Sequence, residues 1–510
     1  MIFHRQFLLA CALSLSTACF GPSGSSQENG ARQTSRAAAA SISLEPCEIA
    51  GPRADVKEKA RCGTYEVFEN RATKNGRKIA LKIVVLSATG PNRAADPFFY
   101  IPGGPGSSAT EDAPYVTPEY AKIRERRDLV FVDQRGTGGS NPLNCKFFNP
   151  SSLQSYLGAF FPLAEVRQCR EQLEPRADLK LYTTPIAMDD LDEVRAALGY
   201  DQINIIGTSY GTRATQVYLK RHPKHVRTII LHGVSPTGQF MPRDFPQQTE
   251  RALNGVIDEC GADAACRAAF PNLRAETKAV LERLLRGPVK VAVKNPQTGV
   301  STSVELSRDL AAEAIRYMLY QSGAASRLPL FLHLAAQGDF VRLAESAIFY
   351  RQQIVATGSN GMYLSVTCAE DLPWIKPREG ERNAEHTFLG DYRLRDQRAA
   401  CTLWPRGEIP KDYAEPTRSR VPALILTGQW DPVTPPVYGD TTAKYLSNSL
   451  HVVVPHGGHG FNGLEGLDCI QNLIAEFVDR GTTKGLEPSC LKSIRRRGFV
   501  LSLVAPTRSP

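Results

Sequence analysis

The sequence has little of what membrane-spanning, metal-binding or nucleic-acid-binding proteins need. After its first 18 residues, no apolar run is long enough to span a bilayer. It has no Cys-x-x-Cys pair and no cluster of Cys with His, so we expect no metal site and no other cofactor. The 61 basic and 52 acidic residues are interspersed, which argues against a nucleic-acid partner. The one dense basic run, Arg495 to Arg497, favours a solvated C-terminal tail over residues 496–510.

The N-terminus has the features of an export signal, predicted over residues 1–19. His4 and Arg5 precede an apolar run from Phe7 to Ala18 that is too short for a mature membrane helix. Cys19 ends a sequence that resembles a lipoprotein cleavage box, so a lipid on Cys19 and simple cleavage both stay open. Residues 20–45 are rich in Gly, Ser and Ala and predict a flexible linker. We therefore expect an exported protein, periplasmic or extracellular, whose only membrane contact would be a lipid on Cys19.

The cysteine count supports export. Of twelve cysteines, Cys11 and Cys19 belong to the signal or its anchor, which leaves ten, an even number. Paired cysteines are typical of exported proteins. Pairing between neighbours along the chain predicts five disulfides: Cys47–Cys62, Cys145–Cys169, Cys260–Cys266, Cys368–Cys401 and Cys469–Cys490.

Length and composition are typical of a globular enzyme with two domains, since the chain has 510 residues, of which 42% are hydrophobic and 22% charged. Strand-like segments alternate with helical ones on both sides of a long helical stretch. The predicted strands are 79–86, 97–101, 128–132, 203–206, 226–231, 421–428 and 451–454. This alternation predicts a doubly wound, mainly parallel sheet in two parts, residues 46–235 and 421–495. Helical patterns dominate residues 236–420, which we interpret as a cap inserted before the last strands.

Three side chains stand just past predicted strands, where parallel sheets carry their active sites. Ser209 lies in Gly207-Thr-Ser-Tyr-Gly211, between a strand and a helix, which is the setting of a nucleophile elbow. Asp431 follows the strand 421–428, and His459 follows the last strand, with His456 as the alternative base. The order Ser, Asp, His is that of the α/β-hydrolase triad. We therefore predict Ser209, Asp431 and His459 as the catalytic residues of acyl transfer.

Two loops are expected to support this triad. Pro102 to Ser108 is a Gly- and Pro-rich loop after a strand, and the N–H groups of Gly104 and Tyr210 are predicted to form the oxyanion hole. The loop from Asp133 to Ser140 is expected to brace its neighbour with its charged pair rather than to act in catalysis. In the cap, Glu370 and Asp371 are adjacent carboxylates that could either face a binding cleft or form a solvated turn.

The chain resembles the prolyl aminopeptidase and tripeptidyl aminopeptidase group of serine peptidases. The resemblance is carried by Pro102-Gly-Gly-Pro-Gly106, Asp133-Gln-Arg-Gly-Thr-Gly138, Gly207-Thr-Ser-Tyr-Gly211, Gly428-Gln-Trp-Asp-Pro-Val-Thr-Pro435 and Gly458-His-Gly460. It implies an α/β-hydrolase core, a helical cap and exopeptidase action at a free peptide N-terminus. It also implies a cap carboxylate that holds the substrate ammonium, for which Glu370 is the best candidate and Asp371 its neighbour.

The sequence departs from the prolyl aminopeptidases at two of these motifs. Pro102 stands where histidine is usual, and Tyr210 stands where tryptophan is usual. Both residues, the large cap and the export signal are closer to the secreted tripeptidyl aminopeptidase branch. The competing hypothesis is a carboxylesterase or lipase that uses the same triad on small esters. The sequence leaves the preferred peptide and the oligomeric state open.

Overall fold

The computed structural model describes residues 42–50, 57–295 and 298–503. The predicted export signal, Cys19 and most of the predicted linker lie outside the described residues. Within the described part, no helix combines the length and the apolar character that crossing a membrane requires.

The core of the protein is one nine-stranded sheet in the order β1-β2-β3-β5-β4-β6-β7-β10-β11. Six neighbouring strands, from β5 to β11 in this order, run parallel, and the first three are antiparallel to their neighbours. All seven predicted strands are present, whereas β1 and β2 were not predicted. The strands are β1 (Glu45–Ala50), β2 (Lys57–Phe68), β3 (Lys78–Leu86), β4 (Phe98–Ile101), β5 (Leu129–Val132), β6 (Ile203–Thr208), β7 (Val226–His232), β10 (Ala423–Gly428) and β11 (Ser449–Val454).

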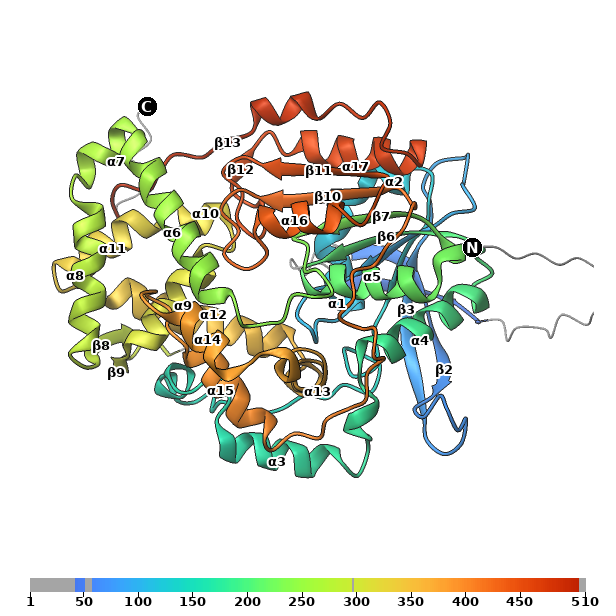
Figure 1. Cartoon of the computed structure of the whole chain (residues 1–510), viewed down its shortest axis with the longest axis horizontal. Helices are drawn as coiled ribbons and strands as arrows, with labels where there is room; N and C mark the ends of the chain where they lie inside the picture. Colours follow the sequence, from blue (N-terminus) through green and yellow to red (C-terminus); the bar gives the residue numbers. More distant parts are fainter. Residues whose placement is uncertain (1–41, 51–56, 296–297, 504–510) are drawn as a thin grey trace, which may run out of the picture. The chain divides into compact units, whose positions relative to one another are not determined.

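Alternate residues of the central strands point to opposite faces of the sheet, and each face has its own layer of helices. In β4, Phe99 and Ile101 pack in the cluster that contains residues of α4 (Thr184–Ala197) and α5 (Tyr210–Arg221). Phe98 and Tyr100 pack in the cluster formed with α1 (Ala109–Val116), α2 (Ala121–Arg124) and α17 (Asp468–Arg480). Each fully buried apolar side chain contributes about 1.5–3 kcal/mol, so both faces stabilise the sheet. Figure 1 shows the sheet between these layers, as the doubly wound prediction requires.

The cap has a separate hydrophobic cluster and lies between β7 and β10 in the sequence. The predicted helices at 275–285, 307–319 and 328–336 are α8, α9 and α11, whereas the hairpin β8–β9 was not predicted. Figure 1 shows these elements beside the sheet. They are α6 (Phe245–Ala262), α7 (Ala264–Ala269), α8 (Leu273–Leu285), β8 (Val289–Lys294), β9 (Ser301–Leu306), α9 (Arg308–Met318), α10 (Ser322–Ala325), α11 (Leu328–Ala336), α12 (Val341–Thr357), α13 (Asn360–Glu370), α14 (Pro377–Ala384) and α15 (Tyr392–Cys401).

Segments outside 236–420 also pack on the cap. Leu153, Tyr156 and Leu157, from the segment before α3 (Leu163–Leu173), join the hydrophobic cluster of the cap. Near the C-terminus, β13 (Arg495–Arg496) pairs with β12 (Leu464–Glu465), and the side chain of Arg496 binds Glu259 with an N–O distance of 2.8 Å. Within the described part of the expected tail, Arg496 therefore has a half-buried acidic partner, and Phe499 and Val500 pack on the cap, whereas residues 497, 498 and 501–503 are exposed.

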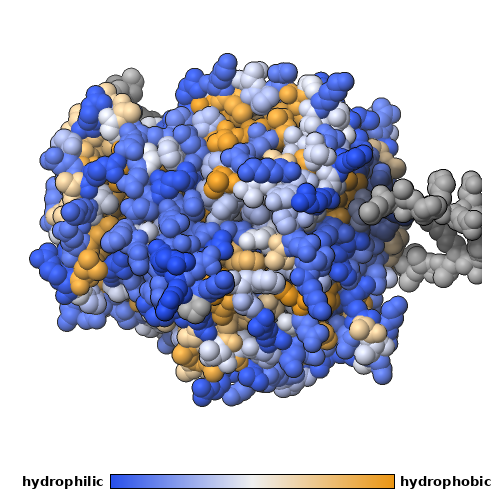
Figure 2. All heavy atoms as spheres, in the orientation of Figure 1, coloured by the Kyte–Doolittle hydropathy of each residue, from blue (hydrophilic) through white to orange (hydrophobic). Residues whose placement is uncertain are grey.

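All ten cysteines in the described residues are paired in the five combinations predicted from their order in the sequence. The pairs are Cys47–Cys62, Cys145–Cys169, Cys260–Cys266, Cys368–Cys401 and Cys469–Cys490. The two cysteines of each disulfide are 6 to 33 positions apart, so every pair joins segments that are close in the sequence. The face of the molecule in Figure 2 is mainly hydrophilic, with its apolar residues in small patches.

Candidate active site

Ser209 lies on a strained turn between β6 and α5. Its φ and ψ are 56° and −122°, a backbone conformation that side chains other than glycine rarely adopt. A Cβ atom at Gly207 would collide with the carbonyl of Gly211, and one at Gly211 would collide with the carbonyl of Ile101. Glycine is therefore required on both sides of the serine, and the turn has the geometry expected of a nucleophile elbow.

His459 is bonded to the buried carboxylate of Asp431. The distance between His459 Nδ1 and Asp431 Oδ2 is 2.8 Å, and Asp431 is fully buried. Asp431 also accepts hydrogen bonds from the backbone N–H groups of Val433 and Thr434 and from the Thr434 hydroxyl, each at 2.8 Å. Burial alone would raise the pKa of Asp431, but the charge of His459 and these hydrogen bonds lower it to about 2. Asp431 is therefore ionised and holds the imidazole in one orientation.

His456, the alternative base, lies in a different environment. Its Nδ1 is 2.7 Å from Glu259 Oε1, and the carboxylate of Glu259 also binds Arg496. His456 does not line the cavity that contains Ser209 and His459. His459, and not His456, therefore lines the same cavity as the serine.

The loop after β4 lies against the elbow, as the sequence predicted. Gly103 is so close to Ser209 that an added Cβ would lie 3.1 Å from the serine Cβ, and Gly104 lines the same cavity. Tyr210 is the first residue of α5, so its N–H belongs to the first turn, where such groups have no partner within the helix. Of the two predicted oxyanion donors, Gly104 lines the cavity and Tyr210 directly follows the serine at the start of α5.

Asp133 braces this loop, which confirms its predicted structural role. Its buried carboxylate accepts hydrogen bonds from the hydroxyls of Ser108 and Thr110 and from the backbone of Thr110, at 2.7 to 2.9 Å. Ser108 in turn caps α1. Arg135, the other half of the charged pair, binds Asp190 on α4 instead, with two hydrogen bonds of 2.6 and 2.9 Å.

A cavity of about 360 Å³ between sheet and cap contains Ser209 and His459. Its size is in the range of small-ligand sites. Only one carboxylate lines it among the described residues, that of Asp112 on α1, together with two arginines, Arg316 on α9 and Arg393 on α15. Burial raises the pKa of Asp112 to about 6, although a hydrogen bond from the Tyr100 hydroxyl opposes the shift. Sequence reasoning missed these three residues; only the place of Asp112, just after the glycine-rich loop, could have drawn attention to it.

Glu370 and Asp371 do not reach this cavity, which corrects the expectation that they contact the substrate. Both are fully buried. Glu370 accepts hydrogen bonds from the N–H and hydroxyl of Thr184, at 2.6 and 2.7 Å, and from the Tyr413 hydroxyl. Asp371 forms an ion pair with Arg213 on α5, at 2.7 Å, and accepts the N–H of Met241. Both oxygens of Glu370 and Oδ1 of Asp371 accept bonds from the protein's own donors, so Glu370 ties the cap to α4 and Asp371 ties it to the elbow helix α5.

Two protein families match this chain. Residues 96–267 match the alpha/beta hydrolase fold, and residues 386–490 match the TAP-like proteins. The serine protease Hip1 of Mycobacterium tuberculosis is 26% identical, over 88% of this chain and 91% of its own. The tripeptidyl aminopeptidase of Streptomyces lividans is 25% identical, over 89% and 87%. The chain is a serine-peptidase-like α/β-hydrolase.

Among solved structures, the proline iminopeptidase of Mycobacterium smegmatis is similar to this hydrolase. Its sequence is 15% identical, and the match covers 82% of this chain and 98% of the other, with a TM-score of 0.37.

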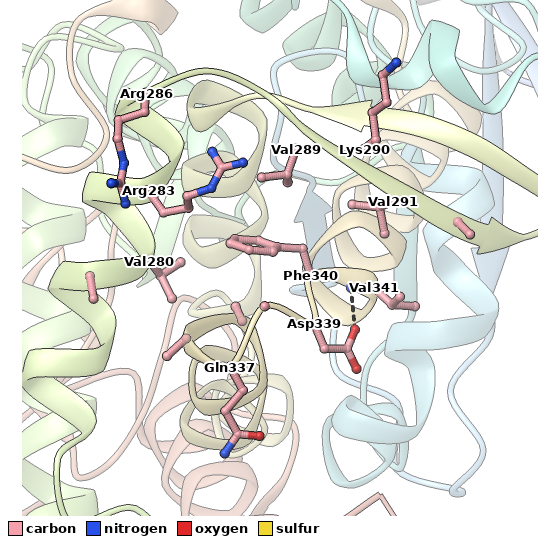
Figure 3. Close-up of a pocket in the computed structure, with 15 residues that line it drawn as sticks. Val280, Arg283, Arg286, Val289, Lys290, Val291, Gln337, Asp339, Phe340 and Val341 are labelled. Atoms are coloured by element: carbon pink, nitrogen blue, oxygen red, sulfur yellow. Dashed lines mark hydrogen bonds between the residues drawn. The ribbon is translucent and has the colours of Figure 1, made fainter.

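The hydrolase has a second hollow, of about 630 Å³, in the cap (Figure 3). It lies between α8, β8 and the turn before α12, and it shares no lining residue with the cavity at Ser209. Figure 3 shows Arg283, Arg286 and Lys290 at its rim, and Asp339 accepting the N–H of Val341 at 3.0 Å. No histidine, serine or cysteine is among its lining residues.

One group of potential metal ligands occurs in the hydrolase's described residues. Asp192, His222 and His225 offer atoms that lie within 4.8 Å of one another. The carboxylate of Asp192 already accepts hydrogen bonds from Arg195 and Tyr218, so the group has the partners of an ordinary surface network.

Proposed function

We propose that Ser209 is the nucleophile, His459 the general base and Asp431 the residue that orients the base. The observation that supports this most is one arrangement: a serine on a strained elbow shares a cavity with a histidine that is bonded to a buried, ionised aspartate. His459 Nε2 takes the proton of the Ser209 hydroxyl while the serine oxygen attacks the substrate carbonyl. The resulting imidazolium is stabilised by Asp431.

The oxyanion that forms in this attack is stabilised by the N–H groups of Tyr210 and Gly104. Each such donor typically contributes about 3–4 kcal/mol to lowering the barrier. When the tetrahedral intermediate collapses, His459 gives its proton to the leaving amine or alcohol, and an ester of Ser209 remains. Water, activated by His459, then hydrolyses this ester and regenerates the enzyme.

The substrate that we propose is a peptide with a free N-terminus, from which the enzyme releases a single residue or a short peptide. The relatives named for serine protease and tripeptidyl aminopeptidase activity support this class. An aminopeptidase must distinguish an ammonium group from a neutral amide, which requires a carboxylate in the cavity. Asp112 is the only lining carboxylate among the described residues, so we assign it this role in place of Glu370.

We also propose that the protein is exported. The five disulfides fit an oxidising compartment, periplasmic or extracellular. A signal over residues 1–19 and a lipid on Cys19 remain proposals.

The experiment combines a label with a matched substrate pair. A phosphonate probe for serine hydrolases should label Ser209 and no other serine, as peptide mass spectrometry can establish. The enzyme should then hydrolyse a free-amine tripeptidyl reporter at least about tenfold faster, in kcat/KM, than the N-acetylated form, because one charged contact is lost on acetylation. Equal rates would refute the aminopeptidase assignment. Rapid hydrolysis of short-chain esters together with equal peptide rates would then support the alternative, a carboxylesterase.

A further inference from the structure

Three cap arginines cluster around a single glutamate beside the cavity at Ser209. Arg316 and Glu313 come from α9, Arg351 from α12 and Arg393 from α15. All four are buried, with at most 4% of each residue exposed. Three guanidinium groups therefore face one carboxylate in a region from which most water is excluded. Such an excess of buried charge is costly unless a further group of opposite sign compensates it.

Several N–H groups of these arginines have no partner. Arg316 donates to Tyr320 at 2.7 Å and to Glu313 at 3.3 Å, but its Nε has no hydrogen-bond partner among the described residues. Arg393 donates one weak bond, of 3.4 Å, to Tyr363, and its Nη1 is 3.6 Å from Glu313 Oε1, an ion pair too long for a hydrogen bond. Its Nε has no hydrogen-bond partner in the part of the chain that the structure describes. Buried donors left unpaired cost about 1–3 kcal/mol each. Among the four residues of the cluster, Glu313 Oε2 is the one unpaired acceptor, so they have fewer free acceptor atoms than free N–H groups.

Only two of the three arginines line the cavity. Arg316 and Arg393 do so, and aromatic rings hold them: the Arg316 guanidinium carbon lies 4.3 Å from the Phe245 ring centre, and that of Arg393 lies 3.3 Å from the Phe160 ring centre. Arg351 belongs to the same cluster and also has an unpaired nitrogen, but it does not line the cavity. The rings orient the two guanidinium groups without using their N–H groups.

We infer that Arg316 and Arg393 form a subsite for a carboxylate of the substrate. The planar donor fork of arginine matches the two oxygens of a carboxylate, and such bonds are among the strongest that a protein makes. Apart from tyrosines, which are neutral at pH 7, the other ionisable groups that line the cavity among the described residues are Asp112, which carries the opposite sign, and His459, which is bonded to Asp431. The carboxylate is either an acidic side chain in the released segment or the C-terminal carboxylate of a short peptide.

This inference rests on the proposed function for the reaction at Ser209, so the test uses three substrate pairs. The first is a set of tripeptidyl coumarin amides in which glutamate is compared with glutamine at each position in turn. The second is a tetrapeptide with a free or an amidated C-terminus. The third is the p-nitrophenyl monoester of succinate against that of succinamic acid, which needs only esterase chemistry. We expect one of the two peptide pairs to favour the carboxylate about 10- to 100-fold in kcat/KM, and this pair identifies the source.

The variants Arg393→Met and Arg351→Met separate binding from structure. Both remove one buried charge from the same cluster, but only Arg393 lines the cavity. The carboxylate preference, a ratio measured on one enzyme sample, is independent of the fraction that is folded. We expect it to fall towards one in Arg393→Met and to persist in Arg351→Met. If Arg393→Met does not fold, Arg393→Lys is the alternative. It keeps the charge but lacks the planar pair of N–H donors of the guanidinium group, so it should lower the carboxylate preference in part.

Three results would overturn the inference. The first is that the unmutated enzyme prefers the carboxylate substrate by less than about twofold in every pair. A difference that small is expected when no charged side chain contacts the carboxylate. The second is an equal loss of preference in Arg393→Met and Arg351→Met. The third applies if the enzyme hydrolyses no peptide, in which case the proposed function fails and the ester pair alone tests the inference. Equal rates on the succinate and succinamate esters would then refute the inference.

Discussion

Replacing Glu370 by glutamine tests whether this residue is structural or contacts the substrate. The substitution keeps the size of the side chain and removes its charge. Glu370 is surrounded by three donors, the N–H and hydroxyl of Thr184 and the hydroxyl of Tyr413. The hydroxyl groups can turn to accept a bond from the new amide, so the variant keeps its hydrogen bonds. We therefore expect Glu370→Gln to fold.

The magnitude follows from the pKa of Glu370, which burial raises from 4.5 to about 7 against the opposing effect of its hydrogen bonds. A raised pKa means that the folded protein binds the proton more tightly than the unfolded chain. The stability that this gives is fully present below about pH 4.5 and is lost as the pH rises through 7. At about 1.4 kcal/mol for each pH unit, the loss amounts to about 3 kcal/mol. Glutamine cannot ionise, so the Glu370→Gln variant does not lose this stability as the pH rises.

The assay is the thermal midpoint of unfolding between pH 4.5 and 8, with exposed Glu171→Gln as the control for removing a charge. The midpoint of Glu370→Gln relative to the unmutated enzyme should rise with pH, and that of Glu171→Gln should not. In parallel, the ratio of rates on free and acetylated peptides should stay within about twofold of the unmutated value, because no substrate contact is lost. Parallel pH profiles for both variants, or a tenfold fall in that ratio, would refute the structural role of Glu370.

Three further predictions concern the site and the disulfides. Ser209→Ala and His459→Ala should each lower kcat/KM about 1000-fold or more in steady-state assays, whereas His456→Ala should lower it far less, and the reverse order for the histidines would move the base to His456. For Asp112, the free-over-acetylated rate ratio should rise with pH through about 6, where its pKa lies, and become independent of pH in Asp112→Asn; an unchanged profile would exclude this residue. Thiol titration of the denatured, unreduced protein should find almost no free thiol among the ten paired cysteines, and several free thiols would contradict the disulfides.

The parts of the site that could be predicted from the sequence are those fixed by local geometry. The elbow needs glycine at 207 and 211 because neighbouring backbone leaves no room for a Cβ, and that requirement is visible as a motif. Asp431 and His459 follow strand ends, which parallel sheets bring to one edge. The disulfides were predictable for a similar reason, since each joins neighbouring segments.

The parts that could not be predicted depend on which way a cap side chain points. Glu370 and Asp371 form a conspicuous acidic pair, but the sequence does not reveal that donors on α4, α5 and the segment around Tyr413 surround them. Arg316 and Arg393 belong to no motif and are 77 positions apart in the numbering, on two helices that meet only in the folded cap. The charged residues of the cap could be counted from the sequence, but the sequence does not reveal which of them are buried.

The contacts of α13 give the cap a second role besides covering the cavity. Before its first turn, the Ser359 N–H donates to the carbonyl of Gly106 in the oxyanion loop, at 2.9 Å. At its other end, Glu370 binds Thr184, whose hydroxyl is 2.7 Å from that of Tyr210, and Asp371 binds Arg213. The helix has 11 residues, about 16 Å of rise, and so links the loop that carries Gly104 to the helices α4 and α5.

Because α13 is bonded at both ends, it restricts how the enzyme can open. If α13 moved as a lid, it would pull on the oxyanion loop and on the elbow helix together, and the two N–H donors would lose their alignment. Donors of this type must lie within a few tenths of an ångström of their place to stabilise an oxyanion. Opening for substrate must therefore occur in cap elements without such ties. Helix α15, which carries Arg393, is not such an element, because Cys401 at its end is disulfide-bonded to Cys368 of α13. Arg393 therefore stays in place together with the loop at Gly106.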